Sequence, residues 1–399
     1  MTAVAAALTA LMHQDRGRLL AAIIARTGDF SGAEEALQEA AEAALLHWGR
    51  SGLPDHPQGW LLRVALRKSI DGYRRSARAE AHLALIRQLG AEEAVMAEGQ
   101  EIADERLRLI FTCCHPALEP KTRVALTLRT VCGLTTADIA AVFLDGEPTM
   151  AQRLSRARAK IAAARIPYVV PGAEDWAARL ETVLTVVYLI FTVGYTAGAG
   201  HGLCGEAIFL ARLLQDLRPG DAEVEGCLAL LLLTDARRAA RVDSRGHAVP
   251  PGAQDAALWD GQAQAEGLAL LERAMERRAA GPFQIKAAIS ACQMMRPGPD
   301  WPQIRLLYDR LIGFEPTPVV RLNRAVALME CADLAAAGQE IAALAVELAD
   351  YQPFHAARAE WLARSGCRAE AIAAFDAALR GAGPAETAYL QARRADLAG

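Results

Sequence analysis

The sequence has few of the features that mark a secreted or membrane-spanning protein. Its eight cysteines, in a chain of 399 residues, follow no regular spacing, so no disulfide framework is expected and a reducing compartment is favoured. The first residues lack the basic start and long apolar core of a signal peptide. The longest apolar run, near Val183–Val193, is about half of a membrane span. We therefore expect a soluble, cytoplasmic protein.

Aromatic residues are scarce at 6%, whereas hydrophobic residues make up 53% of the chain. The composition is rich in Ala, Leu and Arg, which all favour helices. This predicts an all-α fold, and the length suffices for roughly two to four domains. The net charge of −4 argues against a protein that coats nucleic acid with its whole surface, but local basic patches are compatible with it.

No nucleophile, base and orienting group occur together as a candidate catalytic set, so we predict no enzyme and no cofactor. Cys113, Cys114 and His115 invite a metal hypothesis. Three consecutive residues of a helix cannot all reach one tetrahedral ion, and no partner Cys-x-x-Cys or His pair lies nearby. We predict a buried thiol pair before the turn at Pro116 in preference to a metal site.

The stretch Gly133–Ile166 contains two short helical patterns separated by the turn sequence DGEP. Thr135 or Thr136 is positioned to cap the first helix, and Thr149 to cap the second. The second pattern is strongly basic and contains no acidic residue from 152 to 165. Two helices joined by a short turn, the second of them cationic, predict a helix-turn-helix whose second helix enters the major groove of DNA. An ordinary amphipathic pair with a solvated basic face is the alternative.

The second helix of this pair supplies the candidate DNA contacts. Leu154 and Ile161 are spaced to face the core, so the remaining polar side chains point outward. The residues assigned to base edges and nearby phosphates are Thr149, Gln152, Arg153 and Arg156. Arg158 and Lys160 lie further along the helix and are assigned to phosphates.

Three amphipathic helices are predicted before this stretch. The first covers residues 8–30, and the second, Ala33–Trp48, exposes an acidic and polar face. The third, Trp60–Ala79, is strongly basic, with Trp60 at its start and Tyr73 within it. Aromatic side chains among cations suit unstacked bases, and core packing is the alternative for each of them.

Composition divides the chain into four segments. Residues 8–79 form a first small bundle, and the Ala/Glu-rich residues 80–103 are predicted to be a loosely packed linker. Residues 104–166 contain the helix-turn-helix, and residues 170–399 are predicted to form a helical C-terminal domain.

The C-terminal segment contains an internal repeat. Five small or apolar positions recur at a constant offset of 34 residues, namely Ala325, Leu328, Ala337, Ile341 and Leu344, which correspond to Ala359, Leu362, Ala371, Phe375 and Ala378. This is the period of a tetratricopeptide repeat, in which small residues let paired helices approach closely. Generic periodicity of Ala-rich helices is the alternative.

Several quoted segments, in their order along the chain, resemble extracytoplasmic-function (ECF) type bacterial sigma factors. SGAEEALQEAAEAALLHW and GWLLRVALRKSIDGYRRSAR are similar to region 2, and the helix pair at Leu134–Ile161 is similar to region 4. RLRLIFTCCHPAL, TMAQRLSRARAKI, EGLALL, GPFQIKAAI and VVRLNRAVAL resemble a subgroup with a fused, tetratricopeptide-like helical C-terminal domain.

The resemblance implies partners for each surface. The acidic helix is expected to dock on the β′ clamp helices of core RNA polymerase through Glu34, Glu35, Gln38 and Glu39. The basic helix is expected to engage the −10 promoter element through Trp60, Arg63, Arg67, Lys68, Arg74 and Arg75. The second helix of the helix-turn-helix is expected to read the −35 element. The C-terminal domain is expected to regulate these activities through an intramolecular or protein contact.

Two other functional classes remain open. A one-component DNA-binding regulator would sense a ligand or partner through the repeats and would not bind polymerase. A repeat scaffold would leave the basic helices merely solvated. A simple regulator needs one basic helix and a scaffold needs none, whereas this chain has two basic helices and an acidic one.

Overall fold

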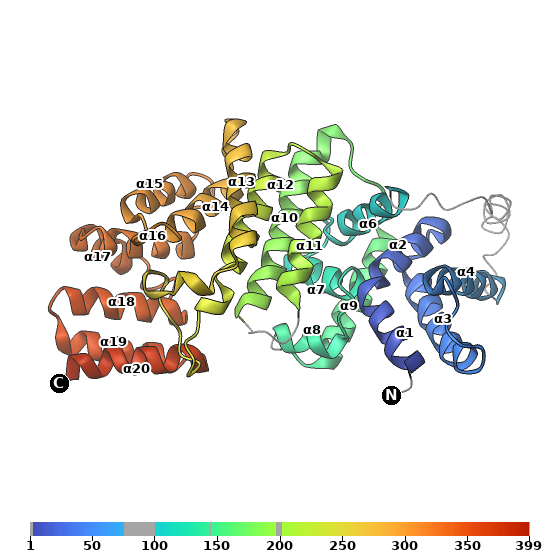
Figure 1. Cartoon of the computed structure of the whole chain (residues 1–399), viewed down its shortest axis with the longest axis horizontal. Coiled ribbons are helices and arrows are strands. Elements are labelled where there is room, and N and C mark those ends of the chain that lie inside the picture. The colour runs from blue at the N-terminus through green and yellow to red at the C-terminus, as the bar shows by residue number, and fades with distance from the viewer. Residues whose placement is uncertain (1–2, 76–99, 144, 197–201, 399) are drawn as a thin grey trace. The chain divides into compact units, whose positions relative to one another are not determined.

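A computed structural model of the chain describes residues 3–75, 100–143, 145–196 and 202–398. Over these residues the secondary structure consists of helices and one isolated antiparallel bridge, between Val242 and Ala248 (Figure 1). The prediction of an all-α fold is confirmed. The chain divides into two compact units, Met1–Leu217 and Arg218–Gly399.

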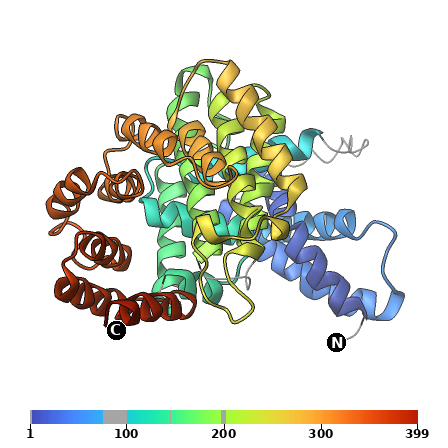
Figure 2. The same ribbon diagram turned by 60° about the vertical axis from the view of Figure 1, so that its left-hand side comes forward.

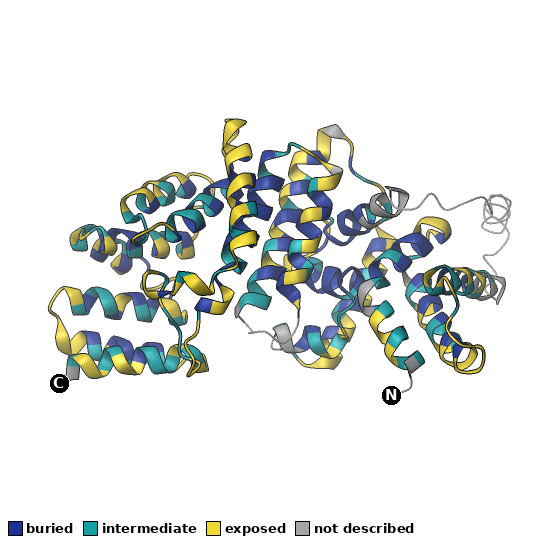
Figure 3. Cartoon of the chain, in the orientation of Figure 1, coloured by how far each residue is buried: buried dark blue, intermediate teal, exposed yellow. Residues whose placement is uncertain are grey.

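The first unit is a set of packed helices in which one short helix is central. Its helices are α1 (Ala3–Gln14), α2 (Arg16–Thr27), α3 (Phe30–Ser51), α4 (Pro57–Arg75), α6 (Gln100–Cys113), α7 (Pro120–Thr130), α8 (Thr136–Phe143), α9 (Glu147–Ala163), α10 (Ala173–Thr196) and α11 (Leu203–Leu217). Helix α2 packs against α3 and α4 on one side and against α6 and α7 on the other. It is therefore buried almost all round, as the dark colour of this helix in Figure 3 shows.

A close approach of backbones holds α2 against the segment that follows α7. A Cβ atom on Gly17 would lie 2.6 Å from the carbonyl oxygen of Val131, so only glycine fits at this position. Tyr168, which follows α9, donates hydrogen bonds from its hydroxyl to the carbonyl oxygens of Ala21 at 3.2 Å and of Glu105 at 3.0 Å. Burial raises the pKa of the Tyr168 hydroxyl, which keeps it a donor. The α2, α3 and α4 bundle and the α6 to α9 helices are thus packed together within this unit.

The structure corrects several predicted boundaries. The single helix expected over residues 8–30 is two helices, because the chain leaves helical geometry at Asp15, a residue type favoured at helix N-caps. Residues 100–103, expected to belong to a linker, form the start of α6. The rest of that linker, up to residue 99, lies outside the described residues, as does the end of the predicted basic helix beyond Arg75.

Helix α10 belongs to the first unit, although residues from 170 onward were predicted to start the C-terminal domain. Arg179 donates a hydrogen bond to the carbonyl oxygen of Phe111 at 2.7 Å, and the rings of Trp176 and Phe111 lie 5.2 Å apart. Among the described residues, Glu174–Tyr195 is long and apolar enough to cross a membrane by length and composition alone. Its packing on α6, α7 and α11 is that of a core helix.

The second unit is a stack of helices joined by short loops. Its helices are α12 (Ala222–Asp235), α13 (Gly261–Glu276), α14 (Pro282–Gln293), α15 (Trp301–Ile312), α16 (Pro318–Glu330), α17 (Leu334–Ala343), α18 (Gln352–Arg364), α19 (Arg368–Leu379) and α20 (Pro384–Ala398). Asp260 caps α13 by accepting hydrogen bonds from the backbone of Gln262 and Ala263, as its position after Trp259 suggested. Successive helices along the chain pack on one another.

The 34-residue repeat is a structural repeat. Helix α18 begins and ends 34 residues after α16, and α19 begins 34 residues after α17. The ten repeat positions are all buried, with exposed fractions of 3% or less. Small residues among them let α16 approach α17 and α18 approach α19. The spacing therefore reflects repeated helix pairs and not chance Ala-rich periodicity.

The last helix of the second unit is tied back to an early loop of the same unit. The backbone N–H of Ala248, in the loop between α12 and α13, donates to the carbonyl oxygen of Ala385 at 2.8 Å. Figure 2 shows the later helices curving so that α20 lies beside this loop. Arg393 and Arg394 also join α20 to its neighbours, through Glu360 at 2.8 Å and Asp376 at 2.6 Å.

Candidate nucleic-acid interface

Helices α8 and α9 form the helix-turn-helix geometry that the sequence predicts. The Thr135 hydroxyl accepts a hydrogen bond from the Asp138 backbone at 3.1 Å, and the Asp138 carboxylate accepts from the Thr135 backbone at 3.2 Å. This reciprocal capping box fixes the start of α8. The expected core residues Ile139, Leu154 and Ile161 are buried, so the opposite side of α9 faces solvent.

The start of α9 differs from the prediction. Gly146 and not Thr149 occupies the N-cap, and Pro148 lies in the first turn. Proline suits this position because its missing N–H needs no helical partner there and its fixed backbone angle is helical. Pro148 was the sequence signal for this earlier start. Thr149 is consequently inside the helix, with an exposed side chain free to face a ligand.

Four of the six residues predicted on α9 form one exposed stripe. They are Thr149, Gln152, Arg156 and Lys160. Their spacing of three to four residues places them on one face of the helix. Two cations, two hydrogen-bonding side chains and a helix long enough to lie along a groove make this stripe chemically suited to phosphates and base edges.

Arg153 is already engaged within the helix-turn-helix. Its guanidinium lies 2.6 Å from the Asp145 carboxylate and 5.9 Å from the centre of the Phe143 ring. Only 24% of its side chain is exposed. Asp145 is thus a functional residue that sequence reasoning did not assign, because a spacing of eight residues across a turn carries no local signal. It neutralises one of the predicted DNA contacts.

Arg158 is engaged as well, and its partner overturns another prediction. Its guanidinium forms an ion pair with Glu34 of α3, which also binds Arg16 and Arg129. Glu34 was expected to be exposed on the acidic face, but only 15% of its side chain is accessible. The prediction of exposure is wrong for Glu34, because arginines from three other helices surround its carboxylate.

The rest of the acidic face is closer to expectation. Glu35 and Gln38 are exposed, and the Gln38 amide donates to Glu42 at 3.4 Å. Glu39 forms an ion pair with Lys68 of α4 at 3.3 Å, with both side chains about two-fifths exposed. A pair this exposed contributes little to stability and separates readily. Both residues therefore stay accessible to partners.

On α4 the structure distinguishes the remaining candidates. Arg63 and Arg67 are exposed. Trp60 is half-buried, with its ring stacked on His47 at 5.5 Å and at an angle of 63° to Trp48. Arg74 and Arg75 lie in the last turn of α4, where their side chains fall outside the described residues. The packing alternative thus describes part of the Trp60 ring, and the exposed cations form a second basic surface.

The thiols at the end of α6 are buried, as predicted. Cys113 and Cys114 have exposed fractions of 0% and 1%, and the Cys114 sulfur lies 3.6 Å from the Thr127 hydroxyl. Burial raises the pKa of Cys113 well above its usual value and raises that of Cys114 to about 12. Because the thiolate is the reactive form, these groups are inert in the folded protein.

This burial gives a prediction for alkylation. At pH 8 about one Cys114 thiol in 10,000 is ionised, so iodoacetamide should leave Cys113 and Cys114 unmodified while it labels the exposed Cys367. Peptide mass spectrometry before and after addition of denaturant measures this. Denaturant should make all three thiols reactive. Labelling of Cys114 in the folded protein at the rate of Cys367 would contradict the buried pair.

The comparisons with known proteins identify two segments of the chain. Residues 108–161, which cover most of α6 and the helices through α9, match the family described as sigma-70, region 4. Residues 179–275 match a family of unknown function (DUF6596). An uncharacterized protein of Rhizobium meliloti (strain 1021) is 42% identical over 373 residues, covering 90% of this chain and 88% of that protein. No solved structure matches.

Proposed function

We propose, from the premise that this chain belongs to the same family as the Rhizobium meliloti protein and carries a sigma-70 region 4, that it is an alternative sigma factor. In this role it binds core RNA polymerase and directs initiation at specific promoters. The observation that carries the proposal is the coincidence of the region 4 match with the exposed stripe Thr149, Gln152, Arg156 and Lys160 on α9. The same match supports a transcription factor that is not an enzyme and works in the cytoplasm.

The proposal assigns a partner to each exposed surface. The stripe on α9 reads the −35 element, with Gln152 and Arg156 at base edges and Lys160 on a phosphate. Arg63 and Arg67 on α4 engage the −10 element, consistent with the ECF subgroup of sigma factors. Glu35, Gln38 and Glu39 of α3 dock on the β′ clamp helices of polymerase. These three surfaces lie on different helices, so all partners have separate contact residues.

Run-off transcription tests the proposal directly. Purified core polymerase from a related bacterium is combined with the full-length chain and a library of promoter fragments. Sequence-specific transcripts that depend on the chain are the expected result. Binding of the chain to DNA without any transcript, and without association with core polymerase, would instead favour a one-component DNA-binding regulator.

The second unit is proposed to be a tetratricopeptide-like regulatory domain. The matching bounds of α16 with α18, and the burial of all ten repeat positions, support the repeat assignment. Repeats of this kind present extended surfaces for proteins or for other parts of the same chain. A unit of this size fused behind the sigma regions takes the place of a separate regulatory protein.

Truncation measures the contribution of this unit. A chain ending at Leu217 keeps α10 and α11, which pack on α6, and should remain folded. We expect its promoter-directed transcription to differ from that of the full chain at equal concentration. A chain ending at Ile166 is the control for packing, because it exposes Phe111, which Trp176 and Arg179 cover. Equal transcription by the full chain and the Leu217 truncation would contradict a regulatory role.

A further inference from the structure

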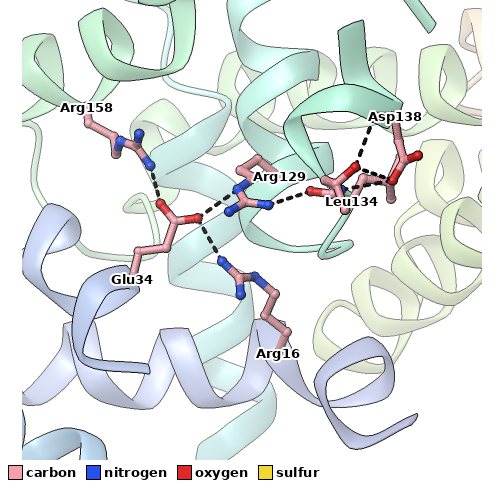
Figure 4. A network of polar contacts seen from close by, with 7 residues as sticks. Arg16, Glu34, Arg129, Leu134, Asp138 and Arg158 are labelled. Carbon is pink, nitrogen blue, oxygen red and sulfur yellow. Dashed lines mark hydrogen bonds and ion pairs between the residues drawn. The ribbon is translucent and has the colours of Figure 1, made fainter. Parts of the chain in front are cut away.

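A single carboxylate holds together two surfaces that have different proposed partners. Glu34 of α3 lies 2.7 Å from Arg16 of α2 and 2.9 Å from Arg129 of α7, and it also pairs with Arg158 of α9 (Figure 4). We call Glu34, Arg16, Arg129 and Arg158 the Glu34 cluster. It joins the acidic helix α3 to the basic helix α9, and Arg129 and Arg158 are 95 and 124 residues away from Glu34 along the chain.

The charge balance makes Glu34 the essential member of this cluster. One carboxylate faces three guanidinium groups, whose side chains are between 11% and 25% exposed. Burial and the neighbouring Arg129 charge lower the pKa of Arg16. Arg129 has a second acceptor, the carbonyl oxygen of Leu134 at 3.0 Å, whereas Arg158 is held by the Glu34 carboxylate. Loss of Glu34 leaves three cations close together, and the most easily displaced of them is Arg158.

The surrounding packing aligns the cluster. The close contact of Gly17 with Val131 sets α2 directly beside the end of α7. Gly133, with a φ of 77°, turns the chain next to the Arg16 side chain. Arg16 and Arg129 therefore come from elements that are fixed to each other. Arg158, on α9, is the member that belongs to the proposed DNA-binding helix.

We propose that the Glu34 cluster is an autoinhibitory latch, in which Glu34 withholds Arg158 from DNA in the free protein. The proposal rests on the sigma-factor function, because it takes α9 as the DNA-binding helix and α3 as the polymerase-docking helix. Polymerase bound along α3 competes for Glu34 and releases Arg158, which then gains a phosphate. Binding of polymerase and binding of DNA are thereby coupled, and each strengthens the other.

Salt dependence of DNA binding by the full-length chain, without polymerase, tests the latch. A short labelled duplex of non-promoter sequence is titrated at several monovalent salt concentrations. Glu34→Gln should raise affinity about eightfold at 0.1 M salt and steepen the salt dependence by about 0.9, the value for one added phosphate contact. Arg158→Gln alone should change neither quantity, because Arg158 does not reach DNA in the latched protein. The double variant should return to the wild-type slope.

The controls separate the latch from general charge effects. Glu35→Gln removes the same charge from the exposed side of the same helix, and it should leave the slope unchanged. The latch is wrong if Arg158→Gln alone lowers the slope, if Glu34→Gln gives no gain, or if the gain survives in the double variant. Should Glu34→Gln not fold, as judged by circular dichroism, the Arg158→Gln result still decides.

Failure of the latch and failure of the proposed function give different results. Sequence-specific transcripts together with a lowered slope for Arg158→Gln would leave the sigma factor standing and remove the latch. A latch behaving as predicted without transcripts would assign it to a DNA-binding regulator. No DNA binding by any variant at low salt would overturn both proposals.

Discussion

Replacing Arg156 by glutamate is expected to lower the affinity of the chain for promoter DNA roughly 100-fold and to abolish promoter-directed transcription. Arg156 lies in the exposed stripe of α9, whereas Arg153 and Arg158 are already paired with carboxylates. A lost contact of about 1–3 kcal/mol is joined by repulsion between the new carboxylate and the phosphates. Fluorescence anisotropy with a labelled −35 duplex, followed by run-off transcription, measures the two effects.

Two further measurements make this prediction specific. Arg358→Glu changes the same charge at an exposed position of α18 in the second unit, and it should leave DNA affinity within about twofold. Association of Arg156→Glu with core polymerase should equal that of the wild type. An unchanged DNA affinity would remove Arg156 from the interface, and a parallel loss of polymerase association would indicate misfolding.

Phe375→Ala is expected to destabilise the second unit by about 3–5 kcal/mol, the usual cost of removing a fully buried aromatic ring. Phe375 is 0% exposed and packs in a cluster with Leu362, Ala371 and Leu390. Its neighbours in this cluster are mostly alanines, which have little side chain with which to fill the cavity. Urea unfolding followed by circular dichroism measures the loss as a lower transition midpoint for this unit.

The same unit provides a matched control. Phe314 is 41% exposed, so Phe314→Ala removes the same atoms from a position that is largely solvated. Its free energy of unfolding should fall by less than about 1.5 kcal/mol, in proportion to the smaller buried area. Equal losses for the two variants would show that Phe375 does not carry the packing of the repeat.

Periodicity predicted the features that depend on neighbours along the chain. Leu154 and Ile161 face the core of the helix-turn-helix because they are two turns apart on one side of α9. The repeat was equally visible, since stacked helix pairs demand small and large residues at fixed intervals. Helix starts were less certain where two cap signals compete, as Thr149 and Pro148 did at α9.

Features that depend on distant parts of the chain were not predictable. A glutamate on a polar helix face has the same pattern whether water or arginines surround it. The partners of Glu34 on α7 and α9 are separated from it by most of the first unit, so only the packing of α2 on α6 and α7 brings them together. Helix α10 illustrates the same limit, because its apolar composition does not state which unit it covers.

The bond between Ala248 and Ala385 has a consequence for how this family can change in length. Open repeat arrays gain and lose whole modules freely, since each module touches only its neighbours. Here the last helix returns to a loop that precedes the array, so the array is closed on itself. Removing residues 318–351, one complete module, would shift Ala385 along the stack and break that contact. Closure thereby fixes the module count, and evolution of the second unit is expected to proceed by substitution within modules and not by duplication of them.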